Sequence, residues 1–280
     1  MVLNTCAVLA TLLANFLLRL SFPISYQVIF VVTTILGVIS VYLFSQIAFE
    51  QSPPKEKANS KQSYLAKVKA FAGEIGVQKD FRNYVISAIV WNFGIHLASP
   101  LFVVYFVEDL GGSAGSWALF SAVNLSAMVL LQRYWGRLAD FFGQKSVMMV
   151  SGLGIITLPL WWAIAPSTWF PFIIYVINGV FWGGYNLAAF NLLLEVTPDD
   201  NRSVYVGVYN TMMGVATAVG PLVGGFAAEV MDMRLIFLAS ALVRAVALYL
   251  FYRNVTDTGT RRLRMRDLVP GQKGRTLPGA

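Results

Sequence analysis

Long apolar runs constrain this chain more than any other feature of its sequence. A helix that spans a bilayer needs about 20 mostly apolar residues, and about eight runs of that kind follow one another. Strands of a membrane barrel would be about ten residues long and would alternate strictly, which these runs do not. Only 12% of the 280 residues are charged, about half the usual share in soluble proteins. The sequence therefore predicts an all-α polytopic membrane protein with spans near residues 2–18, 26–47, 84–106, 113–134, 147–164, 170–194, 204–228 and 236–252.

The basic residues predict how these spans are oriented. The chain carries 21 lysines and arginines, and nearly all of them lie in alternate connections and in the tail after the last span. Arg19 and Arg234 fall on the opposite side, and Arg244 lies within the last span. The positive-inside rule places the basic side in the cytoplasm, so we expect an integral protein of the cell membrane with a cytoplasmic linker and C-terminus. The charge thus indicates topology, and no nucleic-acid partner is expected.

The longest connection, residues 49–80, is basic and carries a short periodic pattern. Apolar side chains recur at helical spacing among its lysines, from Tyr64 to Ile75. This pattern is typical of an amphipathic helix that lies on an anionic membrane surface. A solvated linker with fortuitous periodicity is the alternative, because the window is short.

A short connection between the fourth and fifth runs reads GRLADFFGQK at residues 136–145. Its first glycine can allow close helix approach, and its second can take the left-handed backbone of a tight turn. The aspartate can accept hydrogen bonds from free N–H groups at a helix start, and the basic residues favour the cytoplasmic side. The residues that we single out as a conformational-switch motif are Gly136, Arg137, Asp140, Gly143 and Lys145.

This connection resembles the signature loop G-x-L-a-D-r-x-G-x-k of the major facilitator superfamily. It departs from the signature at Phe141, where the family has a basic residue that joins a charge relay. A second resemblance lies in the seventh run, where GPLVGG at residues 220–225 is similar to the G-P-x-x-G-G motif of the family. Its helix-packing residues are Gly220, Pro221, Gly224 and Gly225.

The order of the segments resembles the C-terminal eight of the twelve helices of that family, whose fold pairs two six-helix bundles. On this mapping residues 1–48 hold the last two helices of the N-terminal bundle and 49–80 form the central linker. Residues 81–253 form the C-terminal six-helix bundle, and 254–280 form a basic cytoplasmic tail. The first run is short and no basic residue precedes it, so we expect an N-terminally truncated fragment. The alternative is that later spans override a weak first signal.

The resemblance also implies which polar residues line a substrate path. In the family, the first two helices of each three-helix repeat face the cavity. The candidates on those helices are Asn92, His96, Asn124, Tyr185, Asn186, Tyr209 and Asn210. The single histidine among them can carry a proton, so proton-coupled movement of a small solute is one interpretation. Hydrogen bonds between helices explain these polar side chains equally well.

Charged and aromatic residues outside the path carry two further predictions. Glu195 and Arg202 are expected to cluster with the arginine of the signature loop and to clamp one conformation, with Arg244 as an additional member. Trp161 and Trp162 predict an aromatic anchor at the outer membrane interface.

The resemblance implies a secondary transporter that moves a small solute across the bilayer by alternating access. The alternative is a non-transporting membrane interaction module, or a half-carrier that pairs with a complementary half-transporter or with itself. The sequence has no paired histidines, no Asp-rich motif and no Ser/His/Asp set at one membrane depth. No enzymatic activity, catalytic residue, cofactor or metal site is therefore expected.

Overall fold

The computed structural model describes residues 23–46, 78–199 and 201–256, with a few isolated positions before residue 18. Within these residues the chain forms seven long α-helices and no strand. All seven are long and apolar enough to cross a membrane, which confirms the predicted all-α membrane fold. Most of the first predicted span, of the linker and of the tail lies outside the described residues.

Most of the helices extend further than the apolar runs that predict them, whereas α2 is shifted by two residues toward the N-terminus. Their bounds are α2 (Ile24–Ser45), α4 (Lys79–Glu108), α5 (Ala114–Phe142), α6 (Gln144–Ala163), α7 (Phe170–Glu195), α8 (Arg202–Ala228) and α9 (Met233–Asn254). The largest difference is in α5, which continues to Phe142 although its apolar run ends near residue 134. At 1.5 Å per residue its 29 residues reach about 44 Å, which exceeds the roughly 30 Å hydrocarbon layer. Hydropathy reports only the part inside that layer.

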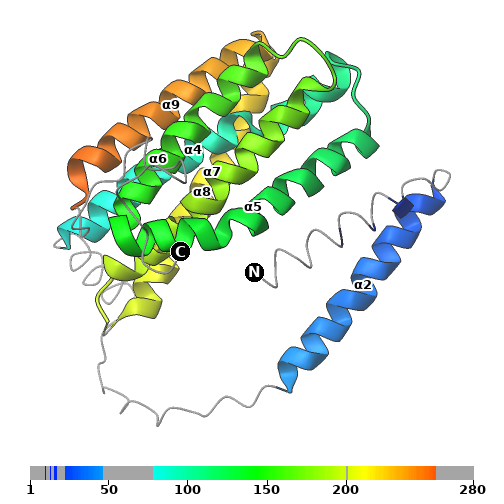
Figure 1. The fold of residues 1–280 in the computed structure, drawn as a ribbon. Coiled ribbons are helices and arrows are strands. Elements are labelled where there is room, and N and C mark those ends of the chain that lie inside the picture. Colours follow the sequence, from blue (N-terminus) through cyan, green and yellow to red (C-terminus); the bar gives the residue numbers. More distant parts are fainter. Residues whose placement is uncertain are drawn as a thin grey trace, which may run out of the picture.

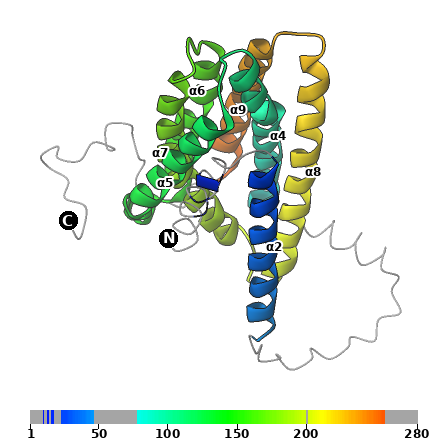
Figure 2. The same cartoon turned by 90° about the vertical axis from the view of Figure 1, so that its right-hand side faces the viewer.

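The six helices from α4 to α9 form one bundle of two interlocked triplets (Figure 1). Helix α4 packs on α8 and α9, helix α7 packs on α5 and α6, and α6 packs on α9. If α4, α5 and α6 are exchanged with α7, α8 and α9 in that order, the same set of helix contacts results. The exchange pairs α5 with α8, and these two helices lie on opposite flanks of the bundle in Figure 2. The bundle therefore has the internal two-fold pattern of a structural repeat.

Polar side chains join the triplets across their interfaces. The indole nitrogen of Trp135 in α5 donates to the carbonyl of Val180 in α7 at 2.7 Å. The hydroxyl of Tyr84 in α4 donates to the carbonyl of Ala189, also in α7, at 2.9 Å. Such bonds matter in a bilayer because apolar burial does not drive membrane helices together as it does in water.

Helix α2 stands apart from this bundle in Figure 1. Ser25 is its one buried residue among those described, and apolar side chains such as Phe30 and Val41 are 69% and 71% exposed. An apolar helix with this much exposed surface is suited to contact with lipid or with further helices.

Candidate functional site

The junction between α5 and α6 consists of a single residue, Gly143. Helix α5 ends at Phe142 and α6 begins at Gln144. The backbone at Gly143 has φ of 86° and ψ of 155°, a region that essentially only glycine occupies. The signature loop is thus a one-residue corner, and a residue with a Cβ would be strained there.

The other residues of the signature loop lie along the last turns of α5. Asp140 is exposed there, and α6 begins without a side-chain cap, so the expectation that Asp140 caps the following helix is wrong. Arg137 is also exposed. A Cβ at Gly136 would meet only Leu187 within 4 Å, at 3.9 Å. The structure therefore has no close helix approach that requires a glycine at position 136.

Lys145 makes the most extensive contacts of the loop residues. Although it is a lysine, it is only 8% exposed. Its ammonium donates to the carbonyl of Tyr252 at 3.0 Å and to the carbonyl of Val255 at 2.6 Å, and it lies 5.5 Å from the centre of the Tyr252 ring. A cation at a helix C-terminus satisfies unpaired carbonyls and complements the helix dipole. Lys145 thus links the start of α6 to the end of α9.

Replacing Lys145 with methionine tests this link, because methionine keeps an apolar stem and removes the ammonium. We expect backbone amides at the end of α9, including that of Val255, to exchange with deuterium roughly tenfold faster or more. The estimate follows from hydrogen bonds to charged groups, which contribute about 1.5–3 kcal/mol. Hydrogen exchange followed by mass spectrometry of the purified chain measures the effect. The control is Arg137→Met, which removes an exposed cation from the same loop; equal exchange in the two variants would contradict the link.

Two glycines of α8 lie at its contact with α4. A Cβ at Gly220 would lie 2.8 Å from the Cβ of His96, and a Cβ at Gly224 would lie 1.9 Å from the carbonyl oxygen of Leu97. Gly225 faces open space, since an added Cβ would have no atom within 4 Å. The GPLVGG segment therefore brings the α8 and α4 backbones together through two of its three glycines.

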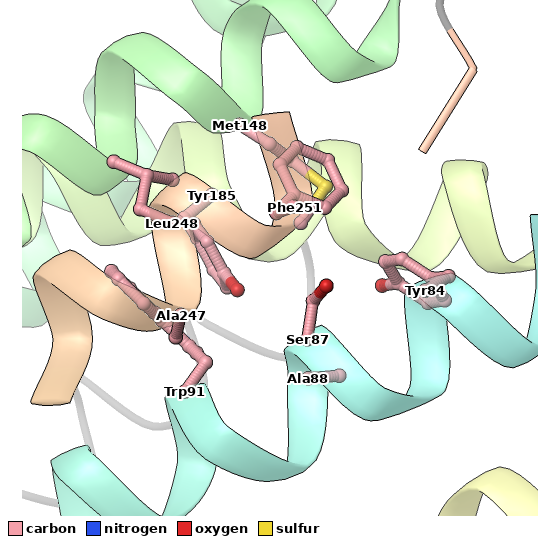
Figure 3. A pocket seen from close by; sticks show the side chains of 9 residues that line it. All are labelled: Tyr84, Ser87, Ala88, Trp91, Met148, Tyr185, Ala247, Leu248 and Phe251. Carbon is pink, nitrogen blue, oxygen red and sulfur yellow. The ribbon is translucent and has the colours of Figure 1, made fainter. Parts of the chain in front are cut away.

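Tyr185 and Tyr209 are brought into an aromatic group at the α4 interface. Tyr185 stacks on Trp91 with ring centres 4.9 Å apart, and Tyr209 stacks on Tyr84 at 5.8 Å. Tyr84, Trp91 and Tyr185 of this group line a pocket of about 10 Å³, close to the space that one water needs. Figure 3 shows α4 and α9 facing one another across it, with Tyr185 from α7 and Met148 from α6.

Three other path candidates lie between helices and contact their neighbours. The amide of Asn92 donates to the carbonyl of Ala88 at 2.8 Å and to the sulfur of Met213 in α8 at 3.0 Å. The amide of Asn124 in α5 donates to the carbonyl of Tyr175 in α7 at 3.2 Å. His96 is half-buried against α8. These contacts match the interpretation of helix-to-helix bonds, although they leave surface for a solute.

The remaining path candidates are Asn186 and Asn210. Both are exposed on the bundle, on α7 and α8. They are therefore the most exposed of the four candidate asparagines. Asn186 follows Tyr185 in α7, and Asn210 follows Tyr209 in α8.

The residues of the predicted charge cluster lie in two different places. Arg202 pairs with Asp199 and approaches the carbonyl of Leu194 at 3.5 Å, at the same end of α7 as the exposed Glu195. Arg244 instead lies in the bundle interior, midway along α9, and is 3% exposed. Within the described ranges no three His, Cys, Asp or Glu side chains gather as a metal site would require.

Several residues that contact the predicted candidates were not themselves predicted from the sequence. Tyr84, Ser87 and Trp91 line the pocket of Figure 3, and their spacing along α4 places them on one helix face. That spacing was a usable signal. Trp162 was expected at the membrane interface, yet it is 3% exposed, whereas Trp161 is 38% exposed; adjacent positions on a helix point in different directions, and hydropathy does not separate them.

Comparison with known proteins gives one family model and several relatives. A model of the Major Facilitator Superfamily matches residues 83–275. The chain is 31% identical over 162 residues to the multi-drug resistance efflux pump PmrA of Streptococcus pneumoniae, which covers 56% of this chain and 39% of that protein. It is 32% identical over 151 residues to the PmrA homolog of Lactococcus lactis, covering 52% and 37%.

A further relative is the class H tetracycline resistance protein of Pasteurella multocida. It is 25% identical over 179 residues, which covers 63% of this chain and 44% of the relative. In each of these three comparisons the matched segment spans less than half of the relative's length.

Proposed function

Because the chain belongs to the Major Facilitator Superfamily, we propose that it is part of a secondary transporter that moves a small solute by alternating access. The observation that carries this proposal is the bundle of two interlocked triplets. In this family the transported solute sits where two such bundles meet, and one bundle rocks against the other. The proposal therefore includes a complementary N-terminal half, to which residues 1–48 contribute.

The names of the relatives support a drug-like solute that is exported. Two of the three are described as multi-drug resistance efflux proteins and the third as a tetracycline resistance protein. The solute path runs along the face that carries Tyr185, Asn186, Tyr209 and Asn210. Aromatic rings with a few amides suit the mixed apolar and polar chemistry of such solutes.

The second part of the proposal concerns the topology of the chain in the membrane and the coupling of transport to protons. The positive-inside rule supports a cytoplasmic position for residues 49–80 and 254–280 in the cell membrane. His96 is the group that would take up a proton during transport, because it is half-buried at the contact of α4 and α8 and histidine is a residue type that commonly carries protons.

An efflux measurement tests the transport proposal. The chain is produced in cells without drug pumps of their own, alone or together with the N-terminal half of the Streptococcus relative, and loss of a fluorescent dye that the full-length relative exports is followed. We expect efflux only when both halves are present, because one bundle offers nothing to rock against.

Two outcomes would contradict this proposal. If the chain alone exports the dye at the rate of the full-length relative, the need for a second half is wrong. If the two halves are both in the membrane and associate, yet export no dye, the transport role of this chain is wrong. A variant with Gly224 replaced by leucine serves as the inactive control, since it separates α8 from α4.

The exposed apolar surface favours a second candidate, a membrane interaction module without transport activity. Val215, Leu222 and Phe226 of α8 are 58%, 62% and 69% exposed, which leaves a continuous apolar face for another membrane protein or for a second copy. Cross-linking in mild detergent measures such association. Detection of monomers alone would count against this candidate and would leave the transporter proposal untouched.

A further inference from the structure

A second and larger cavity in the six-helix bundle is lined by a different set of residues from the pocket of Figure 3. Its volume is about 220 Å³, and five helices, α4 to α7 and α9, contribute to its wall. Aromatic rings form much of this wall, among them Phe102, Trp117, Trp162 and Trp182. Phe102 stacks on Trp162 with ring centres 5.2 Å apart. The cavity is therefore an aromatic chamber within one bundle.

Arg244 contributes a charge to this wall. It lies midway along a membrane-spanning helix and is 3% exposed, where an ionised side chain is costly and marks function by default. Its guanidinium donates to the carbonyl of Ile155 at 3.3 Å and approaches that of Gly94 at 3.5 Å. These are neutral and long contacts, so they compensate only part of the charge.

Arg244 also has no acidic partner in the part of the chain that the structure describes. The ion pair found there joins Arg202 to Asp199. A guanidinium offers several N–H donors in a planar fork, and two carbonyl contacts leave donors over. A buried cation with spare donors on a cavity wall is matched by an anion, most directly by a carboxylate that accepts two parallel hydrogen bonds.

Asn178 in α7 provides an independent sign that the cavity takes a polar ligand. It lines the same wall, and its side-chain oxygen is buried without a hydrogen-bond partner. A buried acceptor without a donor is costly and is rare in folded proteins. A hydroxyl or N–H group of a bound molecule, or a water held beside it, would satisfy this oxygen.

We propose that this cavity binds a small aromatic carboxylate, with the carboxylate on Arg244 and the ring among the tryptophans. The volume supports a ligand of one ring, since pockets for drug-sized molecules measure about 300–1,000 Å³. The aromatic wall favours a planar ring through stacked and edge-on contacts. The site lies within one bundle and its occupancy is an equilibrium property, so the proposal goes beyond transport and does not depend on it.

Binding of benzoate to the purified full chain in detergent tests the proposal. Trp117, Trp162 and Trp182 report occupancy through tryptophan fluorescence, and benzyl alcohol serves as the neutral probe of similar shape. We expect a saturable change with benzoate and at least about tenfold weaker binding of benzyl alcohol, because hydrogen bonds to a charged group contribute most of the affinity. Equal affinity for the two probes, or no saturable binding of benzoate, overturns the proposal.

Two variants locate the site, each accepted only if its melting temperature and helical content match the unaltered chain. Arg244→Gln removes the charge and is expected to weaken benzoate binding about tenfold or more. Ser99→Leu fills space at the cavity wall and keeps Arg244, and it is expected to abolish binding. It therefore tests the site even if Arg244→Gln fails to fold. The control is Gly214→Ala on α8, where an added Cβ meets no atom within 4 Å. Unchanged benzoate affinity in a folded Arg244→Gln or Ser99→Leu variant overturns the proposal.

Discussion

Replacing Gly224 with alanine is expected to lower the melting temperature of the purified chain by several degrees. The added Cβ would lie 1.9 Å from the carbonyl oxygen of Leu97 and 3.0 Å from its carbonyl carbon. Both atoms belong to the α4 backbone, so no side-chain rotation relieves the overlap and the two helices must separate. Overpacking of this kind costs roughly 1–3 kcal/mol or more, and a chain of this size loses about 2–4 °C per kcal/mol. Thermal unfolding in detergent, followed by tryptophan fluorescence, measures the shift.

The matched control is the neighbouring glycine of the same motif. An alanine at Gly225 would have no atom within 4 Å and adds a better helix former, so its melting temperature should stay the same or rise slightly. Comparing the two variants separates steric overlap from the general effect of losing a glycine. Equal melting temperatures in Gly224→Ala and Gly225→Ala would mean that α8 and α4 do not meet at this glycine.

Replacing Gly143 with alanine is expected to destabilise the junction of α5 and α6 by roughly 1–3 kcal/mol. The backbone there has φ of 86° and ψ of 155°, and a Cβ in that region collides with the adjacent peptide groups. The corner has one residue and therefore no neighbour that can absorb the change. We expect a lower melting temperature and faster deuterium exchange at the first amides of α6, beginning with Val147, whose N–H donates to the carbonyl of Gly143 at 3.3 Å.

Gly136 provides the control for this second experiment. It belongs to the same signature loop, but it lies inside α5, and an added Cβ would only touch Leu187 at 3.9 Å. Gly136→Ala should therefore leave stability unchanged or raise it by up to about 1 kcal/mol through helix propensity. If both variants lose the same stability, the strain at the corner is not the cause.

Much of the fold could be predicted from the sequence because helices that cross a bilayer are recognisable as long apolar runs. Seven of the predicted runs coincide with helices in the described residues, since each must satisfy its backbone within itself and present an apolar surface. The ends were harder to place. The segment from residue 135 to Phe142 is polar enough to leave the hydrocarbon layer, and hydropathy ended the span there although the helix continues.

The candidate site was less predictable, because its chemistry depends on which helices meet. Gly143 could be inferred to need a positive φ from a glycine between two spans. The role of Lys145 depends on the carbonyls of Tyr252 and Val255, which lie more than a hundred positions along the chain. Arg244 was recognisable as a charge inside a span, yet only the packing of α9 against α4 and α6 places it on an aromatic cavity instead of a charge cluster.

The glycine contacts have a mechanical consequence for the bundle. Gly94 and Gly224 bring α4 against α9 and α8, while Gly179 and Gly184 bring α7 against α5 and α6. The helices pack closely at these glycines, against backbone atoms at Gly179 and Gly224 and against side chains at Gly94 and Gly184, so neither set of three helices deforms easily within itself. Movement between the two sets would occur at their shared interface, which includes the packing of α6 on α9 and the bond from Tyr84 in α4 to Ala189 in α7. A force on one end of the bundle would therefore turn each set largely as a rigid body. Deformation would be concentrated at the interface between the two sets.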